Sequence, residues 1–465
     1  MYPSAVNVSH VDRVLESLVA EGQGVRGKTQ SVLLGHDILE DAARWIVERH
    51  PDARHLCVCD SNTLRAGADR FASALRGAGR SAELWVLEPA GHGDAVVCDD
   101  ATVDRVRARL ASEPGLNPVA VGAGSLNDIV KMAATLVGRP YQCVATAASM
   151  NGYTSAIAAV LSRGVKVTTP TEQAQAVFAD IDIITAAPPV LTRAGFGDLL
   201  SKPFSHADWL LSHHVRGAPY AERPARLLDD AYELLLERAE GIGLGDPEAI
   251  AILARALLVS GFCMAIAGTS APASGGEHLV SHYWDMEQHC LAQPVRALHG
   301  TQVGIATRLS AFLFDRLGAL TASDIDPVAA SLRRPDPSWL DELPARHPGF
   351  DAEVLAEVRA RILAKQRHGA ELRAELEAVR SRWPDIRAAL GAALVPATVI
   401  SRALVAAGAP ARPSDIGVAH EHAVRTLQVC RHVRDRYVAL DLMDDLGVLG
   451  RWSSEAVDAC EESDL

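Results

Sequence analysis

The fold is decided by the stretch Pro118-Val-Ala-Val-Gly-Ala-Gly-Ser-Leu-Asn-Asp-Ile-Val-Lys131. Its apolar start is typical of a buried strand, two glycines follow, and a helical pattern begins near Ser125. Gly122 and Gly124 let the backbone approach a diphosphate closely, and the free N–H groups of the following helix attract anions. Ser125 or Asn127 could cap that helix. The stretch therefore predicts a strand, a phosphate-binding turn and a helix. It is not a G-x-G-x-x-G motif, and a plain βα turn is the alternative.

Short apolar runs alternate with helical patterns on both sides of this stretch, up to about residue 190. Further strands are expected at 31–35, 55–60, 82–87 and 141–145, with helices near 42–46, 64–75 and 103–110. This alternation is typical of βαβ units and of a parallel sheet covered on both faces. Ligands of such sheets bind at the carboxyl ends of the strands. We therefore expect an α/β dinucleotide-binding domain over residues 1–190.

From about residue 191 the strand pattern disappears and helical periodicity dominates. Helices are expected at 227–239, 248–267, 303–317 and 351–379. The long, charged stretch 353–382 is expected to be one solvated outer helix rather than a partner-binding coil. The second half, residues 191–465, is therefore predicted to be an all-helical metal and substrate domain, with the site in the cleft between the halves.

The composition is that of a globular, acidic protein: 48% of the 465 residues are hydrophobic and the formal net charge is −13. A net negative charge without a basic stripe argues against nucleic-acid binding. The first 27 residues lack a signal-peptide core, and no uninterrupted run of about 18 apolar residues occurs, so we expect a cytoplasmic protein without a membrane span. The eight cysteines lack zinc-ribbon spacing, and we interpret them as buried free thiols.

Three residues of the second half could bind a metal ion. Asp198 follows a glycine pair that we expect to be flexible, His278 precedes His282 by four positions on one helical face, and His299 opens an apolar helix. One carboxylate and two imidazoles leave coordination positions open, as in catalytic rather than structural sites. Such a cation would polarise a carbonyl, and His282 could shuttle a proton or hold a substrate oxygen. The alternative is that these are ordinary surface or capping residues, since Asp198 lies 80 positions before His278.

These segments, in this order, resemble the iron-containing alcohol dehydrogenase and dehydroquinate synthase superfamily, and within it the sn-glycerol-1-phosphate dehydrogenases, especially the longer bacterial branch. The resemblance extends from about residue 30 to 450 and implies a dehydroquinate synthase-like fold, with an α/β N-terminal domain and an all-α C-terminal domain. It rests on Val121-Gly-Ala-Gly-Ser-Leu-Asn-Asp128, Thr146-Ala-Ala-Ser-Met-Asn-Gly-Tyr-Thr-Ser155, Gly195-Phe-Gly-Asp-Leu-Leu200, Ser274 to Met286, Leu298-His-Gly-Thr-Gln-Val-Gly304, and the tail segments 408–417 and 440–449.

The resemblance implies a role for each matching residue. Asp198, His278 and His299 match the metal ligands, usually of zinc and in some members of nickel or iron. His282 and Asp198 match catalytic, substrate-contacting positions. Asp60 matches the acid on the adenosine side, although a helix cap is the other interpretation. The remaining cofactor-binding positions are Gly122, Ala123, Gly124, Ser125, Leu126, Thr146, Ala147, Ala148, Ser149 and Ser155.

The implied reaction interconverts dihydroxyacetone phosphate and sn-glycerol 1-phosphate with NADH or NADPH, a step of phospholipid metabolism. The expected partners are a small phosphorylated substrate and further copies of the same chain. One position departs from the family pattern Ser-Met-Asp-Gly: residue 151 is Asn. Asn keeps the size of Asp and one acceptor but loses the negative charge and gains a donor. Asn151 is therefore either a substrate-binding residue with a neutral amide or a simple turn residue.

Three alternatives stay open at this point. Asn151 favours a dehydrogenase of the same fold that acts on another small phosphorylated or polyol ketone. A lyase like dehydroquinate synthase would need a cluster of cations around a phosphate, and only Lys131 and Lys202 lie near the motifs. A non-catalytic binding relative is the third alternative, and it conflicts with the presence of all three metal-ligand positions.

Overall fold

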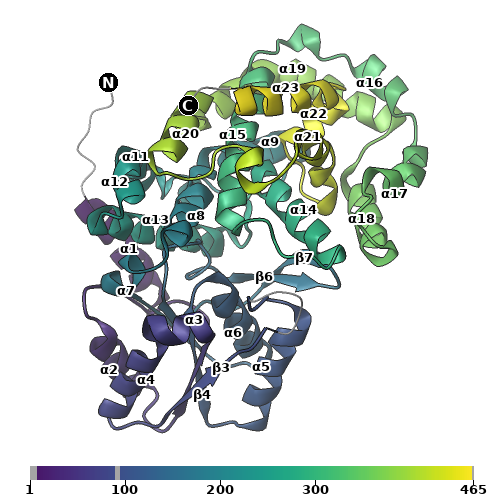
Figure 1. Cartoon of the computed structure of the whole chain (residues 1–465). Helices are drawn as coiled ribbons and strands as arrows, with labels where there is room; N and C mark the ends of the chain where they lie inside the picture. Colours follow the sequence, from purple (N-terminus) through teal and green to yellow (C-terminus); the bar gives the residue numbers. More distant parts are fainter. Residues whose placement is uncertain (1–7, 90–94, 463–465) are drawn as a thin grey trace. The chain divides into compact units, whose positions relative to one another are not determined.

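The computed structural model describes residues 8–89 and 95–462, which separate into two compact units (Figure 1). The first unit contains Met1–Ser162, Lys166–Leu199 and Arg223–Ser270. The second contains Arg163–Val165, Leu200–Glu222 and Ala271–Leu465. Helices of residues 223–270, which the sequence pattern places with the second half, thus pack in the first unit, because their apolar faces contact its helices α1 (Val8–Gly22) and α7 (Ile181–Thr185).

A six-stranded parallel sheet forms the core of the first unit. Its inner strands are almost completely buried, as expected for a parallel sheet covered on both faces. The strands, in spatial order, are β1 (Ser31–Gly35), β8 (Ala176–Asp180), β5 (Gln142–Ala145), β4 (Leu116–Gly122), β2 (Arg54–Cys59) and β3 (Ala82–Val86). The five strands expected from the sequence are present. β8 and the separate pair β6 (Ile157–Ser162) and β7 (Val165–Pro170) were not predicted.

The winding of the sheet reverses next to β2. The chain runs from β2 outward to β3 and returns on the other side of β2 with β4, after which β5 follows as the next neighbour. Open parallel sheets bind ligands at such a reversal, outside the carboxyl ends of the strands. Asp60, the glycine turn at residue 122 and Thr146 come directly after β2, β4 and β5, so three predicted cofactor segments share this edge.

Helices cover both faces of the sheet: α2 and α4 lie on one face and α5 and α6 on the other (Figure 1). The helices of this unit not yet given are α2 (Leu39–Arg49), α3 (Ser61–Thr63), η1 (Leu64–Ala68), α4 (Asp69–Gly77), α5 (Asp100–Ser112), α6 (Gly124–Leu136), α8 (Pro189–Leu200), α10 (Glu222–Arg226), α11 (Asp229–Glu237), α12 (Ala239–Leu244) and α13 (Pro247–Ala267).

Two helical segments of the described residues are long and apolar enough to cross a membrane by length and composition alone, Pro247–Ala267 and Gly369–Ala406. The most apolar window of the first is 83% buried, so α13 has the character of a core helix. In the second, the window is 22% buried, and the chain leaves the helix between Ala393 and Ala397.

The second unit is built from helices. They are α9 (Lys202–Arg216), η2 (Ala271–Ala273), α14 (Gly276–Cys290), α15 (His299–Gly318), η3 (Ala322–Asp324), α16 (Pro327–Arg333), η4 (Pro337–Glu342), α17 (Leu343–Arg346), α18 (Ala352–Lys365), α19 (Gly369–Ala393), α20 (Ala397–Ala406), η5 (Pro413–Ile416), α21 (His420–Val429), η6 (Cys430–Val433), α22 (Ala439–Asp445) and α23 (Leu449–Glu462). The expected single helix over 353–382 is wrong. The chain breaks between α18 and α19, where Gly369 has a φ of +47° and donates its N–H to the carbonyl of Arg334.

The cysteines are free thiols, as predicted: seven of the eight are buried and Cys290 is partly exposed. Cys57 and Cys59 lie on β2, where burial raises the pKa of these thiols to about 12 and about 11. Both side chains belong to the apolar core between the sheet, α2 and α4. They therefore serve packing and not a metal site.

Candidate active site

The glycine turn after β4 is fixed by close packing. A Cβ atom at Gly122 would lie 2.4 Å from Cδ1 of Leu126, and one at Gly124 would lie 3.2 Å from Cγ of Met150. Neither glycine has a positive φ, so close contact rather than backbone strain selects glycine here. The turn therefore brings main chain, without intervening side chains, to the carboxyl edge of the sheet.

Helix α6 begins one residue earlier than predicted, at Gly124, and no side chain caps it. The predicted caps are wrong: Ser125 lies inside the first turn, and the Asn127 amide donates to the carbonyl of Gly152 at 3.3 Å. The sequence could not show this, because that carbonyl comes from a loop 25 positions later. An uncapped helix N-terminus with its partial positive charge suits an anionic ligand such as a diphosphate.

Lys131 holds the β5 loop, our name for residues 146–156. Its fully buried Nζ donates to the carbonyl oxygens of Gly152 at 2.7 Å and Ile157 at 2.9 Å, and to Oγ of Ser155 at 3.1 Å. It also pairs with Oδ1 of Asp128 at 3.1 Å. Lys131 is therefore a structural cation of the first unit, which removes one of the two lysines that a lyase would need.

The first residues of the β5 loop are packed tightly against α8. Thr146, Ala147 and Ala148 are buried, and a Cβ atom at Gly195 would lie 2.0 Å from the carbonyl oxygen of Ala148. The expected flexible glycine pair is therefore wrong. Gly195 lies inside helix α8, where the absence of a side chain permits backbone-to-backbone contact.

Two predicted cofactor residues make local structural contacts. The Asp60 carboxylate accepts hydrogen bonds from the backbone N–H groups of Asn62 and Thr63, at 3.0 and 2.7 Å, and so caps α3. Ser155 is 1% exposed, and its hydroxyl contacts the carbonyl oxygens of Gly152 and Ile157. Asp60 thus matches the helix-cap interpretation, and a role of either residue toward the cofactor stays a prediction.

Asp198 and Asn151 meet within the first unit. Asp198 lies at the end of α8, is 2% exposed, and accepts a hydrogen bond from the backbone N–H of Asn151 at 3.3 Å. The contact uses the main chain of residue 151, so it is the same for Asn and for the Asp of the family pattern. The departure at this position therefore leaves the orientation of Asp198 intact.

The three predicted histidines meet within the second unit, where α14 packs against α15. His278 and His282 lie one turn apart on α14, and His299 is the first residue of α15. The ring centroids of His278 and His299 are 5.2 Å apart, those of His282 and His299 5.5 Å, and those of His278 and His282 6.3 Å. We call these residues the histidine cluster.

Hydrogen bonds at Nδ1 orient the two histidines predicted to bind metal. Nδ1 of His278 lies 2.8 Å from Oε1 of Glu277, which also accepts the backbone N–H of Gly275 at 2.7 Å. Nδ1 of His299 lies 2.7 Å from the hydroxyl of Ser281, which donates to Gln302 at 2.7 Å. Metal-binding histidines commonly use one ring nitrogen for such a contact and the other for the ion. Both rings therefore offer Nε2.

These supporting residues were not predicted from the sequence. Glu277 stands directly before His278, so an acidic neighbour of a candidate ligand was a usable signal. Ser281 and Gln302 gave no signal, because they meet only when α14 packs on α15. All three side chains are buried, which strengthens their polar contacts.

Arg434 is a further residue that the sequence analysis missed. Its Nη2 lies 3.3 Å from Nδ1 of His282, although 152 positions separate the two residues. Arg434 is 8% exposed and follows η6. A donor at Nδ1 fixes the neutral form of His282 that carries its proton on Nε2.

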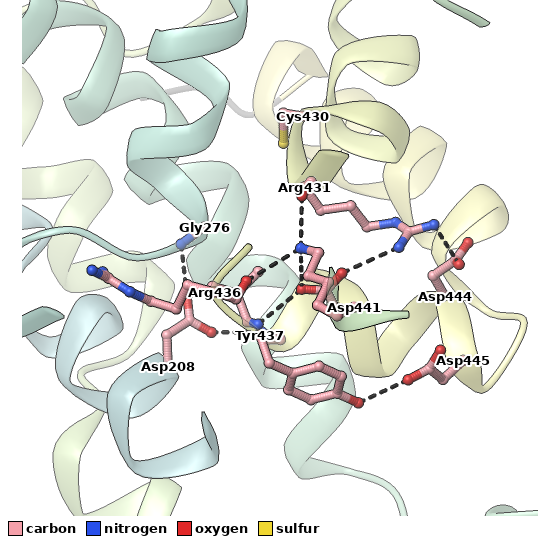
Figure 2. A network of polar contacts seen from close by, with 12 residues as sticks. Asp208, Gly276, Cys430, Arg431, Arg436, Tyr437, Asp441, Asp444 and Asp445 are labelled. Carbon is pink, nitrogen blue, oxygen red and sulfur yellow. Dashed lines mark hydrogen bonds and ion pairs between the residues drawn. The ribbon is translucent and has the colours of Figure 1, made fainter. Parts of the chain in front are cut away.

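The residues around Arg434 belong to a buried polar network (Figure 2). Asp441 joins Nζ of Lys365 at 2.8 Å to Nη1 of Arg431 at 3.1 Å, and the Tyr437 hydroxyl donates to Asp445 at 2.9 Å. We call residues 430–445 the C-terminal segment. These contacts fix the segment at both ends of the stretch that carries Arg434.

Asp208 connects the C-terminal segment with the start of α14. Its two carboxylate oxygens accept backbone N–H groups of Gly276 and Ala439, both at 2.6 Å. Burial, followed by the neighbouring charge of Glu277, raises the pKa of Asp208 to about 8. Asp208 thus stabilises the helix start that precedes His278, and it is partly protonated near neutral pH.

Comparisons with known proteins give one consistent result. The sequence signature of the iron-containing alcohol dehydrogenases matches residues 34–188. Three proteins named glycerol-1-phosphate dehydrogenase [NAD(P)+] are similar to the chain. The one from Bacillus velezensis is 37% identical, with 60% of this chain and 69% of the relative covered. The relative from Bacillus subtilis is 36% identical, with 61% of this chain and 71% of the relative covered. That from Halorubrum lacusprofundi is 31% identical, covering 68% and 88%.

Solved structures confirm the predicted fold class. Glycerol dehydrogenase from Schizosaccharomyces pombe superposes with a TM-score of 0.58 at 14% identity, covering 94% of this chain and 92% of that one. A probable glycerol dehydrogenase from Sinorhizobium meliloti 1021 gives a TM-score of 0.56 at 16% identity, covering 92% and 98%. At these identities the likeness concerns the fold only.

Proposed function

The chain belongs to the glycerol-1-phosphate dehydrogenase family, and we propose that it is a metal-dependent NAD(P)H oxidoreductase that interconverts dihydroxyacetone phosphate and sn-glycerol 1-phosphate. The observation that carries this proposal is the histidine cluster. Its rings are oriented through Nδ1, which suits both Nε2 atoms to be ligands of one cation. This arrangement, in a chain with these relatives, is what a ketone reductase requires.

The nicotinamide dinucleotide would bind at the carboxyl edge of the parallel sheet. The uncapped start of α6 is suited to its diphosphate, with Gly122, Ala123, Gly124, Ser125 and Leu126 forming the turn. The β5 loop, with Thr146, Ala147, Ala148 and Ser149, follows the neighbouring strand and would line the cofactor. These assignments rest on the resemblance to the family, and the topology and close packing of the turn support them.

The metal ligands of the proposal are Asp198, His278 and His299. One carboxylate and two imidazoles suit zinc, which we propose, and also nickel or iron. Both histidines suit a metal ligand, because the Nδ1 atom of each is hydrogen-bonded to a buried side chain. Such a cation, when bound, polarises a ketone carbonyl and so lowers the barrier to hydride addition.

The residues of the chain supply orientation and a hydrogen-bond donor to the substrate oxygen. Asn151 holds the Asp198 carboxylate through its backbone N–H, and Glu277 and Ser281 hold the two ligand rings. His282 carries its proton on Nε2 because Arg434 donates to Nδ1. We assign His282 the role of holding the substrate oxygen through a hydrogen bond from Nε2–H, while a proton from bulk solvent completes the alcohol.

A second candidate keeps the chemistry and changes the substrate. Asn151 replaces the acidic residue of the family pattern, which favours another small phosphorylated or polyol ketone. The lyase alternative loses support because Lys131 is engaged by the β5 loop. We further propose a cytoplasmic homo-oligomer that binds neither nucleic acid nor membranes.

The test is an assay of the purified chain. Oxidation of NADH or NADPH is followed with dihydroxyacetone phosphate and zinc, and the product is checked for resistance to an sn-glycerol-3-phosphate dehydrogenase. His278→Ala should abolish activity, whereas His289→Ala, an exposed histidine on the same helix, should retain it. Full activity in His278→Ala would reject the assignment, and activity only with other ketones would support the second candidate.

A further inference from the structure

A phosphorylated substrate needs a cationic partner close to the reacting carbon. We propose that Arg434 is the subsite for the phosphate of the substrate, a phosphomonoester dianion, and this inference rests on the proposed function. No sequence motif suggested this residue. Lys131, which lies on the helix after the glycine turn, is engaged by the β5 loop.

The position of the guanidinium carries the proposal. Nη2 of Arg434 touches the ring of His282, and that ring lies one helical turn from His278 and 5.5 Å from the ring of His299. In dihydroxyacetone phosphate, one methylene carbon and one ester oxygen separate the ketone carbon from phosphorus. A substrate oxygen that reaches His282 therefore brings the phosphate into the neighbourhood of Arg434.

Polar contacts hold the chain on both sides of Arg434. On one side of it, Arg431 pairs with Asp441 and Asp444, and on the other side the hydroxyl of Tyr437 binds Asp445. Figure 2 shows these contacts, which join residues within the C-terminal segment. A cation that is ordered before the ligand arrives loses little conformational entropy on binding.

The neighbouring arginines of Arg434 are engaged elsewhere. Arg436 donates to the carbonyl oxygen of Ser274 at 2.5 Å and points away from Arg431 toward Asp208 (Figure 2). Arg361 donates to the carbonyl oxygen of Val433 at 2.9 Å. These two residues position the backbone on either side of Arg434.

The charges around Arg434 favour an anion. Burial and the positive charges of Arg436 and Arg361 lower the pKa of Arg434 to about 9, while the adjacent Asp435 acts in the opposite direction. A buried cation near other cations is costly, and a dianion that accepts two parallel N–H bonds offsets this cost. A planar guanidinium matches the geometry of phosphate better than a lysine does.

The experiment compares a phosphorylated with an unphosphorylated ketone. Steady-state rates are measured at saturating NAD(P)H, so that the diphosphate site is filled, for wild type, Arg434→Met and Arg434→Lys. Arg425→Met is the matched control, because Arg425 pairs with Glu287 near the other end of α14. Substrates are dihydroxyacetone phosphate and dihydroxyacetone, and inorganic phosphate serves as a competitive inhibitor.

We expect Arg434→Met to reduce kcat/KM for dihydroxyacetone phosphate roughly 100-fold, the effect of losing a charge-assisted bidentate contact. Its kcat/KM for dihydroxyacetone should fall by a clearly smaller factor, because that ketone loses only the donor at Nδ1 of His282 and no phosphate contact. A circular-dichroism spectrum like that of wild type checks that the variant is folded. Inhibition by phosphate should be lost in Arg434→Met, partly restored in Arg434→Lys and unchanged in Arg425→Met. Equal phosphate inhibition and equal KM in wild type and Arg434→Met would overturn the subsite.

A failure of the proposed function gives a different result. In that case wild type would reduce no keto-phosphate, and the subsite would be judged by calorimetric binding of inorganic phosphate to the NADH-saturated protein. Weaker binding to Arg434→Met than to wild type would support the subsite, and equal affinity would overturn it. If Arg434→Met does not fold, the same comparison with Arg434→Lys decides in the same way.

Discussion

The glycine turn and the β5 loop of the first unit and the histidine cluster of the second are stabilised by different physical means. At the glycine turn and the β5 loop, backbone approaches backbone, and glycine is needed where a Cβ atom would collide. The histidine cluster is held by buried hydrogen bonds between side chains from distant parts of the chain. The glycines of the turn can be recognised in consecutive residues, whereas the contact of Gly195 with Ala148 and the network of distant polar residues require the folded structure. Each region should therefore be sensitive to a different kind of substitution.

Gly195 is the position where close packing should matter most. In Gly195→Ala the new Cβ atom would lie 2.0 Å from the carbonyl oxygen of Ala148, so α8 and the β5 loop must separate. We expect a loss of about 3–5 kcal/mol in the free energy of unfolding, measured by chemical denaturation. Gly391, a helical glycine with open space around it, is the control. Gly391→Ala should stabilise by up to about 1 kcal/mol. Equal effects in the two variants would show that close packing at Gly195 is unimportant.

Lys131 should affect cofactor binding more than substrate binding. Lys131→Met removes the cation that holds the carbonyl oxygens of Gly152 and Ile157, leaving buried acceptors unsatisfied. We expect a loss of about 3 kcal/mol in stability and a roughly tenfold rise in KM for NAD(P)H. Thermal melts and initial rates measure both. An unchanged KM for the cofactor, or an equal rise for the ketone, would contradict the role given to the β5 loop.

The elements of the fold that have a recognisable pattern in consecutive residues could be predicted from the sequence. Five of the six strands of the large sheet and the glycine turn were predicted, because apolar runs and glycines are visible in consecutive residues. β8 was missed, although Ala176–Asp180 is completely buried, since five residues next to the helix start at Ile181 give little periodicity. The break between α18 and α19 was missed because the buried Lys365 looks like an exposed charge until its contact with Asp441 is seen.

The candidate site was predictable only in part. His278, His282 and His299 stand in recognisable motifs, and the structure brings their rings together. Arg434 and Gln302 could not be predicted, since nothing in their neighbouring residues indicates a contact with His282 or Ser281.

Gln302 allows the long-range network to be tested without touching a proposed ligand. Gln302→Leu removes the acceptor of the Ser281 hydroxyl and loosens the orientation of His299. We expect metal affinity to fall about 10–100-fold while the melting temperature changes little. Competition for zinc with a chelating dye measures the affinity. Gln293→Leu, on the exposed turn after α14, is the control and should bind zinc like wild type. An unaltered affinity in Gln302→Leu would show that the network does not orient His299.

Asp208 should give the smallest effect, a pH dependence of stability. Its pKa is raised from the ordinary 3.8 to about 8, mainly by burial, so the folded state holds a proton that the unfolded state releases. The stabilisation is complete below about pH 4 and is lost as pH rises toward 8. Asp208→Asn cannot titrate. The melting temperature of this variant minus that of wild type should therefore rise by roughly 2–5 °C from pH 5 to pH 8. A constant difference between the two proteins across this range would contradict the raised pKa.

The most direct test of the account is the metal content of the full chain. After treatment with a chelator and dialysis, wild type should take up about one zinc ion per chain and recover reduction of dihydroxyacetone phosphate. Asp198→Asn, His278→Ala and His299→Ala should each lose the ion and roughly 1,000-fold in activity, whereas His289→Ala should keep both. Binding of one ion with unchanged affinity by all three variants would contradict the claim that these side chains hold the metal.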